Sequence, residues 1–389
     1  MTAVLLIASA CFFVLAVHPF TIYPLSLLLL RALGVTDAAR GNRTATAAPR
    51  PLRFAICMCA YNEERVIGQK MRNLMQLLER EPGLQILVYV DASSDRTAQL
   101  LQPYADRIFL HVSAERHGKT CGMNLLSARA DADVLVFTDA NVMLDPACLD
   151  DLRRHFADPQ IGCVCGNLNY INGDASITAA SGSLYWRFEE ALKRLESQTG
   201  SMIVADGSIF AVRRELRHAP PDHIIDDMYV SLMTLIDGHR VIQAPDVRAY
   251  EESVAKSSEE FNRKIRIACQ AFNVHRLLWP RLRRLDWLTR YKYVSHKLLR
   301  WLSIFFLGIA ALAFVAALVS AGYPMIALGV VVAATLCGLL GHLWSIRPFA
   351  QVVDLLLALL GAGLGVLRSL RGERFQTWTP ADSIRGGAK

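Results

Sequence analysis

The chain has 389 residues, of which 53% are hydrophobic and 20% charged, with a formal net charge of +7. This length accommodates a sizeable globular core and further segments, and the apolar residues gather near the two ends of the chain. Many basic residues flank those apolar blocks, where anionic lipid headgroups account for them, so we expect no nucleic-acid partner. The nine cysteines include C-x-C pairs without a histidine cluster, which argues against a zinc site and predicts small buried thiols.

The first apolar block runs from Ala3 to Leu30. A span of about 20 residues crosses the hydrocarbon of a bilayer, so the block predicts one kinked transmembrane anchor within residues 1–31. A cleaved signal peptide is the alternative, but such a peptide needs a basic start, and no lysine or arginine precedes Arg31. The small and polar residues 32–51 predict a linker.

The remaining apolar blocks lie between residues 301 and 368. The third of them carries Gln351 and Asp354, so it either spans the membrane or lies at its interface. Leu285–Arg300 alternates aromatic and basic side chains, which is typical of an interfacial amphipathic segment, and we predict such a segment over residues 276–300. The three blocks cover residues 301–320, 323–343 and 349–367, and a basic tail follows over residues 369–389.

Basic residues follow the first apolar block and precede the second. Because cytoplasmic flanks carry the excess of lysine and arginine, residues 52–275 are expected on the cytoplasmic side. The expected location is therefore a bacterial inner membrane, with the lipid bilayer as a partner.

Residues 52–275 alternate between strand and helix patterns. Short apolar runs at Phe54–Cys59, Gln85–Val90 and Val134–Phe137 predict strands, and helical spacing at Val66–Leu78 predicts a helix after the first of them. This alternation predicts an α/β fold with an open, mostly parallel sheet. Ligands of such sheets bind beyond the carboxyl ends of the strands, which is where Glu63, Asp91 and Asp139 are expected.

Asp139 and Asn141 end the third predicted strand. Two residues apart in an extended segment, their side chains would point the same way. Two hard oxygen ligands suit Mg²⁺ or Mn²⁺, with phosphates and water completing the coordination. The alternative is a simple turn that closes the strand.

Three further groups have both a chemical and a structural interpretation. Asp91 would accept hydrogen bonds from a nucleobase or ribose, or it would only close a turn; for Ser93–Asp95 we predict a turn with a helix cap. Lys119 offers a point charge for a phosphate or is a solvated loop lysine. Arg263, Lys264 and Arg266 would neutralise a leaving diphosphate or would face lipid headgroups.

Asp226 and Asp227 are adjacent carboxylates among apolar residues. A carboxylate in partly apolar surroundings has a raised pKa, which suits a general base. The pair also suits the first turn of a helix, where the helix dipole stabilises acidic residues. Both interpretations can hold together.

These motifs together resemble the family 2 membrane glycosyltransferases, the group of the cellulose, chitin, hyaluronan and poly-N-acetylglucosamine synthases. The resemblance runs from about Ala55 to Gln270 and implies a GT-A nucleotide-sugar-binding domain flanked by transmembrane helices. The matching segments are Ala60-Tyr61-Asn62-Glu63-Glu64, Asp91-Ala92-Ser93-Ser94-Asp95, Asp139-Ala140-Asn141, Asp206-Gly207-Ser208-Ile209-Phe210 and Ile225-Asp226-Asp227.

The resemblance also implies a reaction: inverting transfer of a sugar from a nucleotide-sugar, UDP-linked by expectation, with Asp227 as base and Arg266 stabilising the diphosphate. The residues implied to bind the nucleotide-sugar are Ala60, Tyr61, Asn62, Glu63, Asp91, Lys119 and Asp139. Those implied for the acceptor side or sugar pocket are Asp206, Gly207, Ser208, Asp226, Arg263 and Lys264.

Three residues depart from the family pattern. Ala92 stands where the family has a glycine, Asn141 where it has a second aspartate, and Ile267 where the processive synthases have a tryptophan. A glycan or lipid-linked acceptor in exopolysaccharide or cell-envelope synthesis is expected, with single-sugar transfer to a membrane lipid as the alternative. The alternative outside the enzymes is a catalytically silent subunit of a polysaccharide assembly complex. Its partners would be assembly or export proteins.

Overall fold

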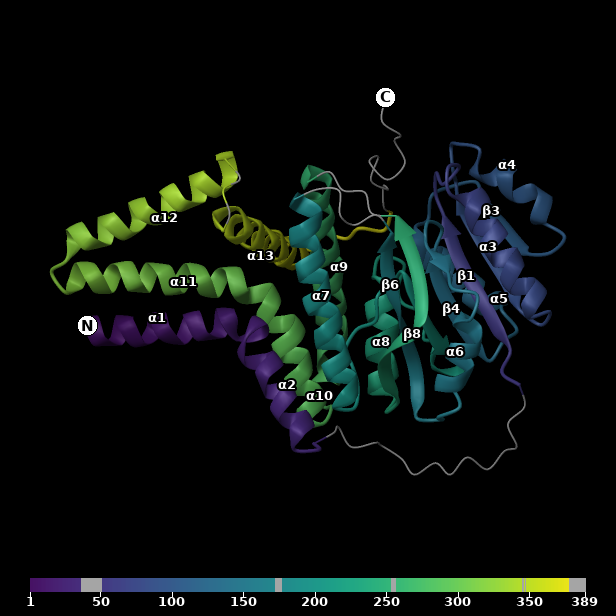
Figure 1. Cartoon of the computed structure of the whole chain (residues 1–389), viewed down its shortest axis with the longest axis horizontal. Helices are drawn as coiled ribbons and strands as arrows, with labels where there is room; N and C mark the ends of the chain where they lie inside the picture. Colours follow the sequence, from purple (N-terminus) through teal and green to yellow (C-terminus); the bar gives the residue numbers. More distant parts are fainter. Residues whose placement is uncertain (36–50, 172–176, 253–256, 345, 347, 378–389) are drawn as a thin grey trace. The chain divides into compact units, whose positions relative to one another are not determined.

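The computed structural model describes residues 1–35, 51–171, 177–252, 257–344, 346 and 348–377 (Figure 1). The chain forms two compact units, which we describe separately. The first comprises Met1–Leu33, Ser257–Phe272 and Arg290–Glu373. The second comprises Gly34–Lys256, Asn273–Thr289 and Arg374–Lys389.

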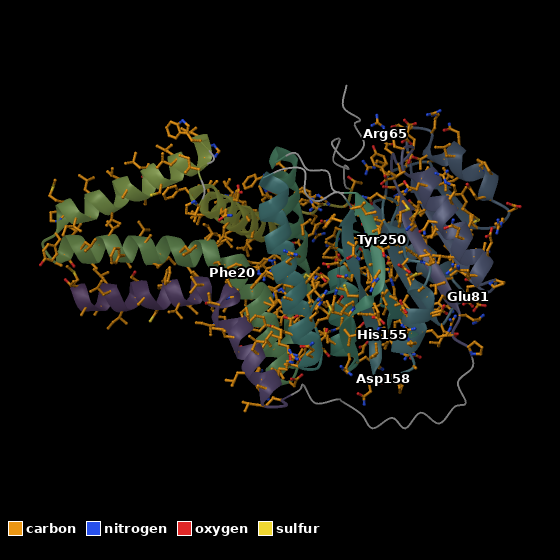
Figure 2. The ribbon with its side chains drawn as sticks, in the orientation of Figure 1. Phe20, Arg65, Glu81, His155, Asp158 and Tyr250 are labelled. Carbon is orange, nitrogen blue, oxygen red and sulfur yellow. The ribbon has the colours of Figure 1, made fainter. Side chains whose placement is uncertain are left out.

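The first unit begins with two helices in place of the single kinked helix predicted from the sequence. Helix α1 spans Thr2–Val17 and α2 spans Ile22–Ala32, with a short 3₁₀ turn at His18–Phe20 between them (Phe20 is labelled in Figure 2). Pro19 lies in that turn. Because proline lacks a backbone N–H and clashes with the preceding turn, it interrupts the helix there.

Helices form most of the described chain between Ser257 and Leu370. They are α9 (Ser257–Leu282), α10 (Trp287–Tyr293), a π-helical turn (Val294–Leu298), α11 (Leu299–Ser320), α12 (Pro324–Trp344) and α13 (Phe349–Leu370). Among the described residues, four helical stretches are long and apolar enough to cross a membrane: Thr2–Phe20, Trp287–Ser320, Pro324–Trp344 and Phe349–Leu370. Of residues 276–300, which were expected to form an interfacial segment, 276–282 end α9, and 287–298 run into α11 after a non-helical connection at 283–286. Whether α13 spans the membrane or lies at its interface remains a prediction.

Glycines let α13 approach its neighbours within the first unit. A Cβ atom on Gly363 would lie 2.4 Å from the Ile304 side chain of α11. A Cβ atom on Gly365 would lie 2.5 Å from Ala268 Cβ of α9. Small residues allow such close contact between helices.

The second unit is built on one mixed sheet. Its described strands are β1 (Phe54–Ala60), β2 (Gln85–Asp91), β3 (Phe109–Ser113), β4 (Val134–Asp139), β5 (Met143–Leu144), β6 (Ile161–Ile171), β7 (Ile209–Arg213) and β8 (Arg240–Glu252). Their order is β3-β2-β1-β4-β7-β6-β8-β5. The first four strands in this order are parallel, as predicted, whereas β7 is antiparallel to both of its neighbours and β5 is antiparallel to β8.

Helices cover this sheet. They are α3 (Ile67–Arg80), α4 (Thr97–Leu101), α5 (Lys119–Arg129), α6 (Cys148–His155), α7 (Ile177–Gln198) and α8 (Asp226–Ile236), with 3₁₀ turns at Gln102–Tyr104 and Arg214–Leu216. The three strands and the helix predicted in this region all form, each ending one or two residues later than predicted. The predicted α/β class is confirmed.

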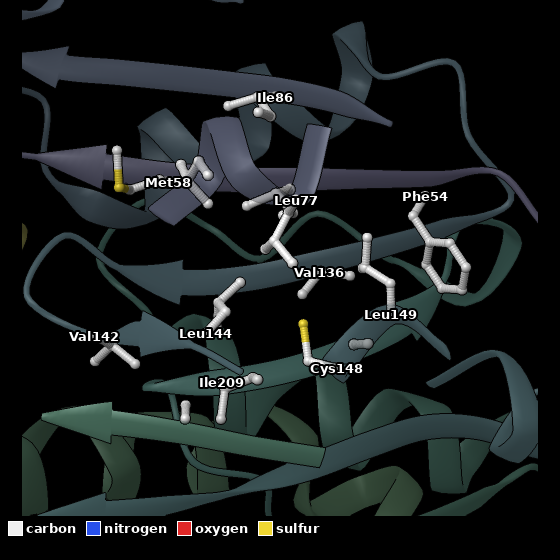
Figure 3. Close-up of a cluster of buried hydrophobic side chains, with 14 of the residues drawn as sticks. Phe54, Met58, Leu77, Ile86, Val136, Val142, Leu144, Cys148, Leu149 and Ile209 are labelled. Carbon is white, nitrogen blue, oxygen red and sulfur yellow. The ribbon is translucent and has the colours of Figure 1, made fainter. Parts of the chain in front are cut away.

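Alternate residues of β1 point to opposite faces of the sheet. Phe54, Ile56 and Met58 contribute to a buried cluster with apolar residues of α3 and α6, including Leu77, Cys148 and Leu149 (Figure 3). Val142 and Leu144, which follow β4, belong to the same cluster. One helical layer thus covers the sheet below the end of β4.

On the opposite face α5 lies very close to the sheet. A Cβ atom on Gly122 would lie 2.5 Å from the Tyr89 ring and 2.6 Å from Cys59 Sγ, so only glycine fits there. Cys57, Cys59 and Cys163 are among the cysteines that are buried, as expected, whereas Cys11 and Cys337 are exposed and Cys121 is half-buried. Burial raises the pKa of the Cys57 and Cys163 thiols to about 12, which keeps them protonated and unreactive.

Ala92 adopts a left-handed backbone conformation, with φ of +50°. This conformation costs a residue with a Cβ about 1–2 kcal/mol, whereas glycine adopts it freely at an unfolded-state entropy cost of about 0.5–1 kcal/mol. We therefore expect Ala92→Gly to leave the melting temperature of the purified protein unchanged or to raise it slightly. The matched control is Ala98→Gly within α4, which should lower stability by about 1 kcal/mol. A clear loss of stability in Ala92→Gly would contradict the strain assignment.

Candidate active site

The carboxyl ends of the parallel strands bring the predicted acidic residues to one edge of the sheet. β1 ends at Ala60, just before Tyr61, Asn62 and Glu63, while β2 ends at Asp91 and β4 at Asp139. Glu63 and Asp91 are buried, whereas the Asp139 side chain is 40% exposed. Asp139 is therefore the member of this group that faces the solvent.

The loops after β1 and β2 are bonded to each other. The Asn62 backbone N–H donates to Ser93 Oγ at 3.0 Å, and Asn62 Oδ1 accepts from the Ser94 N–H at 2.8 Å. Asp95 Oδ1 accepts from the Thr97 N–H at 2.9 Å, which forms the turn predicted for the Ser93–Asp95 segment, whereas the N-cap residue of α4 is Arg96. The two loops form one surface at the sheet edge.

Asp91 holds the loop that leads into α5. Its Oδ1 accepts from the His117 N–H at 2.8 Å, its Oδ2 accepts from the Gly118 N–H at 3.1 Å, and Arg116 Nε lies 3.6 Å from Oδ2. The Arg116 guanidinium lies 3.5 Å from the centre of the Tyr61 ring. Asp91 thus fixes the loop whose next residue is Lys119.

A residue of the predicted tail also contacts this loop. Gln376 Nε2 donates to the His117 carbonyl at 3.2 Å. Gly118 has φ of +90°, and a Cβ atom on it would lie 2.0 Å from the Gln376 carbonyl oxygen. Glycine is therefore required at position 118 both by its backbone angle and by its neighbour.

Lys119 lies among the predicted carboxylates. Its Nζ is 2.6 Å from Asp139 Oδ1. Burial lowers the pKa of Lys119, but the negative charges of Asp139, Asp226 and Asp227 outweigh this and hold the pKa above its usual range. The lysine is consequently a permanent cation at the sheet edge.

Asp226 and Asp227 form the first turn of α8, as the helix-start interpretation predicted. Asp227 Oδ1 accepts from the Met228 N–H at 2.6 Å. Burial, and then the adjacent charge of Asp226, raise the pKa of Asp227 to about 7, and Lys119 limits the rise. Asp226 is buried, and within the described structure its Oδ2 has no hydrogen-bond partner.

Gly207 brings Asp227 and Lys119 together. A Cβ atom on Gly207 would lie 2.8 Å from Asp227 Oδ2 and 3.6 Å from Lys119 Nζ. Since Lys119 also contacts Asp139, the three charged groups border one small space beside Gly207. The resemblance implied one site for Asp139 and Asp227, and the fold places both of them beside Gly207.

Asp206 is held by a buried lysine that the sequence analysis did not identify. Lys193, on α7, forms ion pairs with Asp206 and, at 3.1 Å, with Glu190. Glu190 in turn accepts from Gln243 Nε2 at 2.7 Å. Asp206, Gly207 and Ser208 are half-exposed, so a ligand can reach this predicted acceptor segment. The buried Lys193 holds the segment through its ion pair with Asp206.

Asp139 and Asn141 were expected to point the same way from one extended strand, and the structure differs. The two residues do not share an extended strand, because the chain turns after Asp139 and the Val142 N–H bonds to the Asp139 carbonyl at 3.3 Å. Asn141 instead donates its Nδ2 to Glu251 Oε1, on β8, at 2.7 Å. The same-side argument from strand periodicity is therefore wrong for this pair.

The donor set still fits a divalent cation. The exposed Asp139 carboxylate already attracts one positive charge, the Lys119 ammonium, and the Asn141 amide and Glu251 carboxylate add hard oxygens nearby. Over the described residues no group of three histidine, cysteine, aspartate or glutamate side chains could enclose a metal. This pattern fits Mg²⁺ or Mn²⁺ bound by one or two protein ligands together with phosphates of a substrate.

Arg263, Lys264 and Arg266 lie on α9, within the part of that helix that belongs to the first unit. Arg263 and Lys264 are exposed and Arg266 is half-buried. Burial, and then the neighbouring charge of Arg263, lower the pKa of Arg266. The other candidate residues belong to the second unit, and the assignment of these three cations to a diphosphate stays a prediction.

Lys70 and Asn73 are functional candidates that the sequence analysis missed. Lys70 falls three residues after Ile67 and four before Leu74, so it occupies the apolar stripe of α3. A lysine at a core position of an amphipathic helix was the available signal. Glu251 gave no comparable signal, because nothing in its local sequence links it to Asn141.

The close contact at Gly207 gives a direct prediction. In Gly207→Ala the added methyl group would displace the Asp227 carboxylate, so we expect the turnover rate to fall by about 10²-fold, the usual cost of misplacing a catalytic group by about 1 Å. The measurement is kcat and KM with a nucleotide-sugar. Gly83→Ala is the matched control, since a Cβ atom there meets no atom within 4 Å. An active Gly207→Ala protein would show that Asp227 does not depend on this contact.

Known proteins share sequence similarity with part of this chain. Residues 55–218 match the family model of glycosyl transferase family 2. The hyaluronan synthase of Streptococcus pyogenes is 25% identical over 180 residues, which cover 43% of this chain and 42% of the synthase. The chain thus spans less than half of the length of the curated relatives that it matches.

A solved structure shares the fold. The mannosyltransferase PcManGT from Pyrobaculum calidifontis, determined in complex with GDP-Man and Mn²⁺, has a TM-score of 0.69 and 21% sequence identity. The match covers 94% of this chain and 99% of that chain. The predicted GT-A fold is therefore confirmed.

Proposed function

From the premise that residues 55–218 form a family 2 glycosyltransferase domain, we propose that the protein transfers a sugar from a nucleotide-sugar to a glycan or lipid-linked acceptor at a membrane. The observation that carries this proposal is the meeting of Asp139, Lys119 and Asp227 beside Gly207. A group suited to hold a diphosphate and a group suited to take a proton thus border the same space. Four helical stretches able to cross a membrane, among the described residues, support the membrane location.

Asp227 is the general base of the proposed reaction. It takes the proton of an acceptor hydroxyl as that oxygen forms a bond to the anomeric carbon of the donor sugar. The bond between the anomeric carbon and the phosphate oxygen breaks, and the nucleoside diphosphate leaves with the electron pair. This is a single displacement with inversion, and a pKa raised to about 7 lets the carboxylate accept the proton near neutral pH.

The proposed diphosphate-binding part of the site combines ligands for a cation with basic side chains. Asp139 and Asn141 would hold a divalent cation, which would supply charge neutralisation for the diphosphate when bound. Lys119 offers the same phosphates an ammonium that stays charged at every physiological pH. Arg266 is proposed to stabilise the departing diphosphate, with Arg263 and Lys264 beside it.

The nucleotide part is proposed to bind over the loops after β1 and β2. Ala60 ends β1, and Tyr61, Asn62 and Glu63 lead from it toward the Asp91-supported loop. We expect a UDP-linked donor. The similarity to PcManGT, solved with GDP-Man, makes a GDP-linked sugar the second donor to test.

A panel of radiolabelled sugar nucleotides tests the proposed function. Purified full-length protein in detergent is incubated with each donor, membrane lipid extract and either Mn²⁺ or Mg²⁺. We expect one donor to be consumed, with label moving to a product and with dependence on the added cation. Absence of both transfer and donor hydrolysis under every condition would favour a silent subunit of an assembly complex.

The acceptor side is proposed to involve Asp206, Gly207, Ser208 and Asp226. Because Ile267 replaces the tryptophan of the processive synthases, product length is the informative measurement. A long polymer on a gel would indicate repeated transfer to one chain, as in exopolysaccharide or cell-envelope glycan synthesis. A single labelled lipid band would instead indicate transfer of one sugar to a membrane lipid.

We further propose that residues 52–275 lie on the cytoplasmic side of a bacterial inner membrane. The support is the clustering of basic residues on both flanks of that region. Residues 1–31 would then anchor the chain and residues 301–368 would form the C-terminal membrane helices. Labelling of a cysteine introduced after residue 376 with an impermeant reagent in intact cells would locate the basic tail.

A further inference from the structure

Helix α3 places a lysine under the sheet at the end of β4. Lys70 is completely buried among apolar residues of the cluster that includes Met71, Leu74 and Cys148. Its Nζ donates to Thr138 Oγ1 at 3.2 Å and to the Val142 carbonyl. The lysine therefore contacts both sides of the turn that carries Asp139 and Asn141.

One helical turn later, Asn73 binds the same segment. Asn73 Nδ2 donates to the Leu144 carbonyl at 2.8 Å, and Asn73 Oδ1 accepts from the Leu144 N–H at 2.9 Å. Leu144 belongs to β5, which comes last in the order of the described strands and pairs with β8. The asparagine amide thus satisfies both backbone groups of Leu144, as a neighbouring strand would.

A contribution to folding stability does not explain a lysine at this position. Taking an ammonium out of water costs several kcal/mol, and replacement of a buried charge by an apolar side chain of similar size is often neutral or stabilising. Burial also lowers the pKa of Lys70 to about 7, with the charge of Asp139 opposing the shift. What the lysine provides at this position is a hydrogen bond to the Val142 carbonyl.

We propose that Lys70 and Asn73 are positioning residues that clamp residues 138–144 from beneath the sheet and thereby fix Asp139 and Asn141 for binding a divalent cation and the donor diphosphate. The cation part of this inference rests on the proposed function. The clamp itself does not, because the same contacts should restrain the segment in metal-free protein. Side chains that orient metal ligands typically change metal affinity by about 10–100-fold when they are removed.

Lys70→Met tests the clamp, because methionine keeps the length and the apolar stem of the side chain and removes the ammonium. We expect hydrogen exchange of the backbone amides between residues 138 and 145 to be faster in the metal-free full-length variant than in wild type. We also expect Mn²⁺ in the presence of UDP or GDP to bind at least tenfold more weakly, as measured by the EPR signal of free Mn²⁺. The melting temperature should stay the same or rise, which separates positioning from a purely structural role.

Met71→Leu, a volume-conserving change at a buried neighbour on the same helix, is the control and should match wild type in all three measurements. Lys70→Met with unchanged exchange and unchanged Mn²⁺ affinity would overturn the proposal. Should Lys70→Met not fold, Asn73→Ala decides by the exchange of the Leu144 amide: faster exchange supports the clamp, and unchanged exchange rejects it. If wild-type protein binds no Mn²⁺, the proposed cation site fails, and the metal-free exchange data still decide on the clamp.

Discussion

Asp227→Asn is expected to lower the rate of sugar transfer by about 10²–10⁴-fold, the usual contribution of a general base. Asparagine has nearly the shape of aspartate and can still accept from the Met228 N–H, but it cannot take a proton from an acceptor hydroxyl. Donor binding should change little, because Asp227 has no proposed contact with the nucleotide. The measurement is kcat and KM with the active donor, together with the melting temperature.

The wild-type rate should also depend on pH in a defined direction. A base must be ionised to act, so kcat/KM should fall about tenfold per unit as pH drops below the Asp227 pKa of about 7. In Asp227→Asn this limb should disappear from the residual activity. An unchanged acid limb in the variant would assign the titration to another group.

As pH rises toward 7, the free energy of unfolding should fall, whereas kcat/KM should rise. The folded chain holds a proton at Asp227 up to pH of about 7, whereas the ordinary value for an aspartate is 3.8. Between these values the unfolded chain binds fewer protons, so the free energy of unfolding falls as pH rises through this window. Asp227→Asn removes this cost and should be at least as stable as wild type at pH 8. Asp237→Asn, at the other end of the same helix, is the control and should stay active, since it loses only the pair with His218.

Asp139→Asn is the second substitution with a large expected effect. It keeps the side-chain shape and removes the charge that attracts a cation, so we expect turnover to fall by about 10³-fold, on the order of 4 kcal/mol in barrier height. The rate should be measured over a range of Mn²⁺ and Mg²⁺ concentrations. Part of the loss should be recovered at high Mn²⁺ if weakened cation binding is the cause.

The control for this experiment is Asp106→Asn, an exposed aspartate outside the candidate site. It should leave both the rate and the cation dependence unchanged. Full activity of Asp139→Asn without added divalent cation would refute the role of Asp139 in the proposed site. Loss of activity with unchanged Mn²⁺ binding would place the ion elsewhere.

Much of the catalytic fold could be predicted from sequence periodicity. The buried strands ending at Ala60, Asp91 and Asp139 have continuous apolar runs, and the helix after β1 has a clear apolar stripe, so local patterns determine them. The antiparallel strand β7 between β4 and β6 was not predicted. Pairing between strands far apart in the sequence depends on tertiary packing, which no local pattern records.

The candidate site, too, was only partly predictable from the sequence. Asp139 and Asp227 were recognisable from their motifs, but their proximity depends on Gly207, where the absence of a side chain lets the segment before β7 approach α8. The bond from Asn141 to Glu251 joins residues 110 positions apart. Lys193 lies in a helix whose charged residues suggest a solvated face, yet it is buried beneath Asp206.

The ion pair between Lys119 and Asp139 has a consequence for the order of events at the site. A divalent ion arriving alone has to displace an ammonium that then has no phosphate to pair with. An ion that arrives together with a diphosphate offers Lys119 a new anionic partner as it takes Asp139. If Asp139 binds the cation as proposed, its ion pair with Lys119 disfavours binding of the bare ion, so saturation by Mn²⁺ should require the nucleotide to be present.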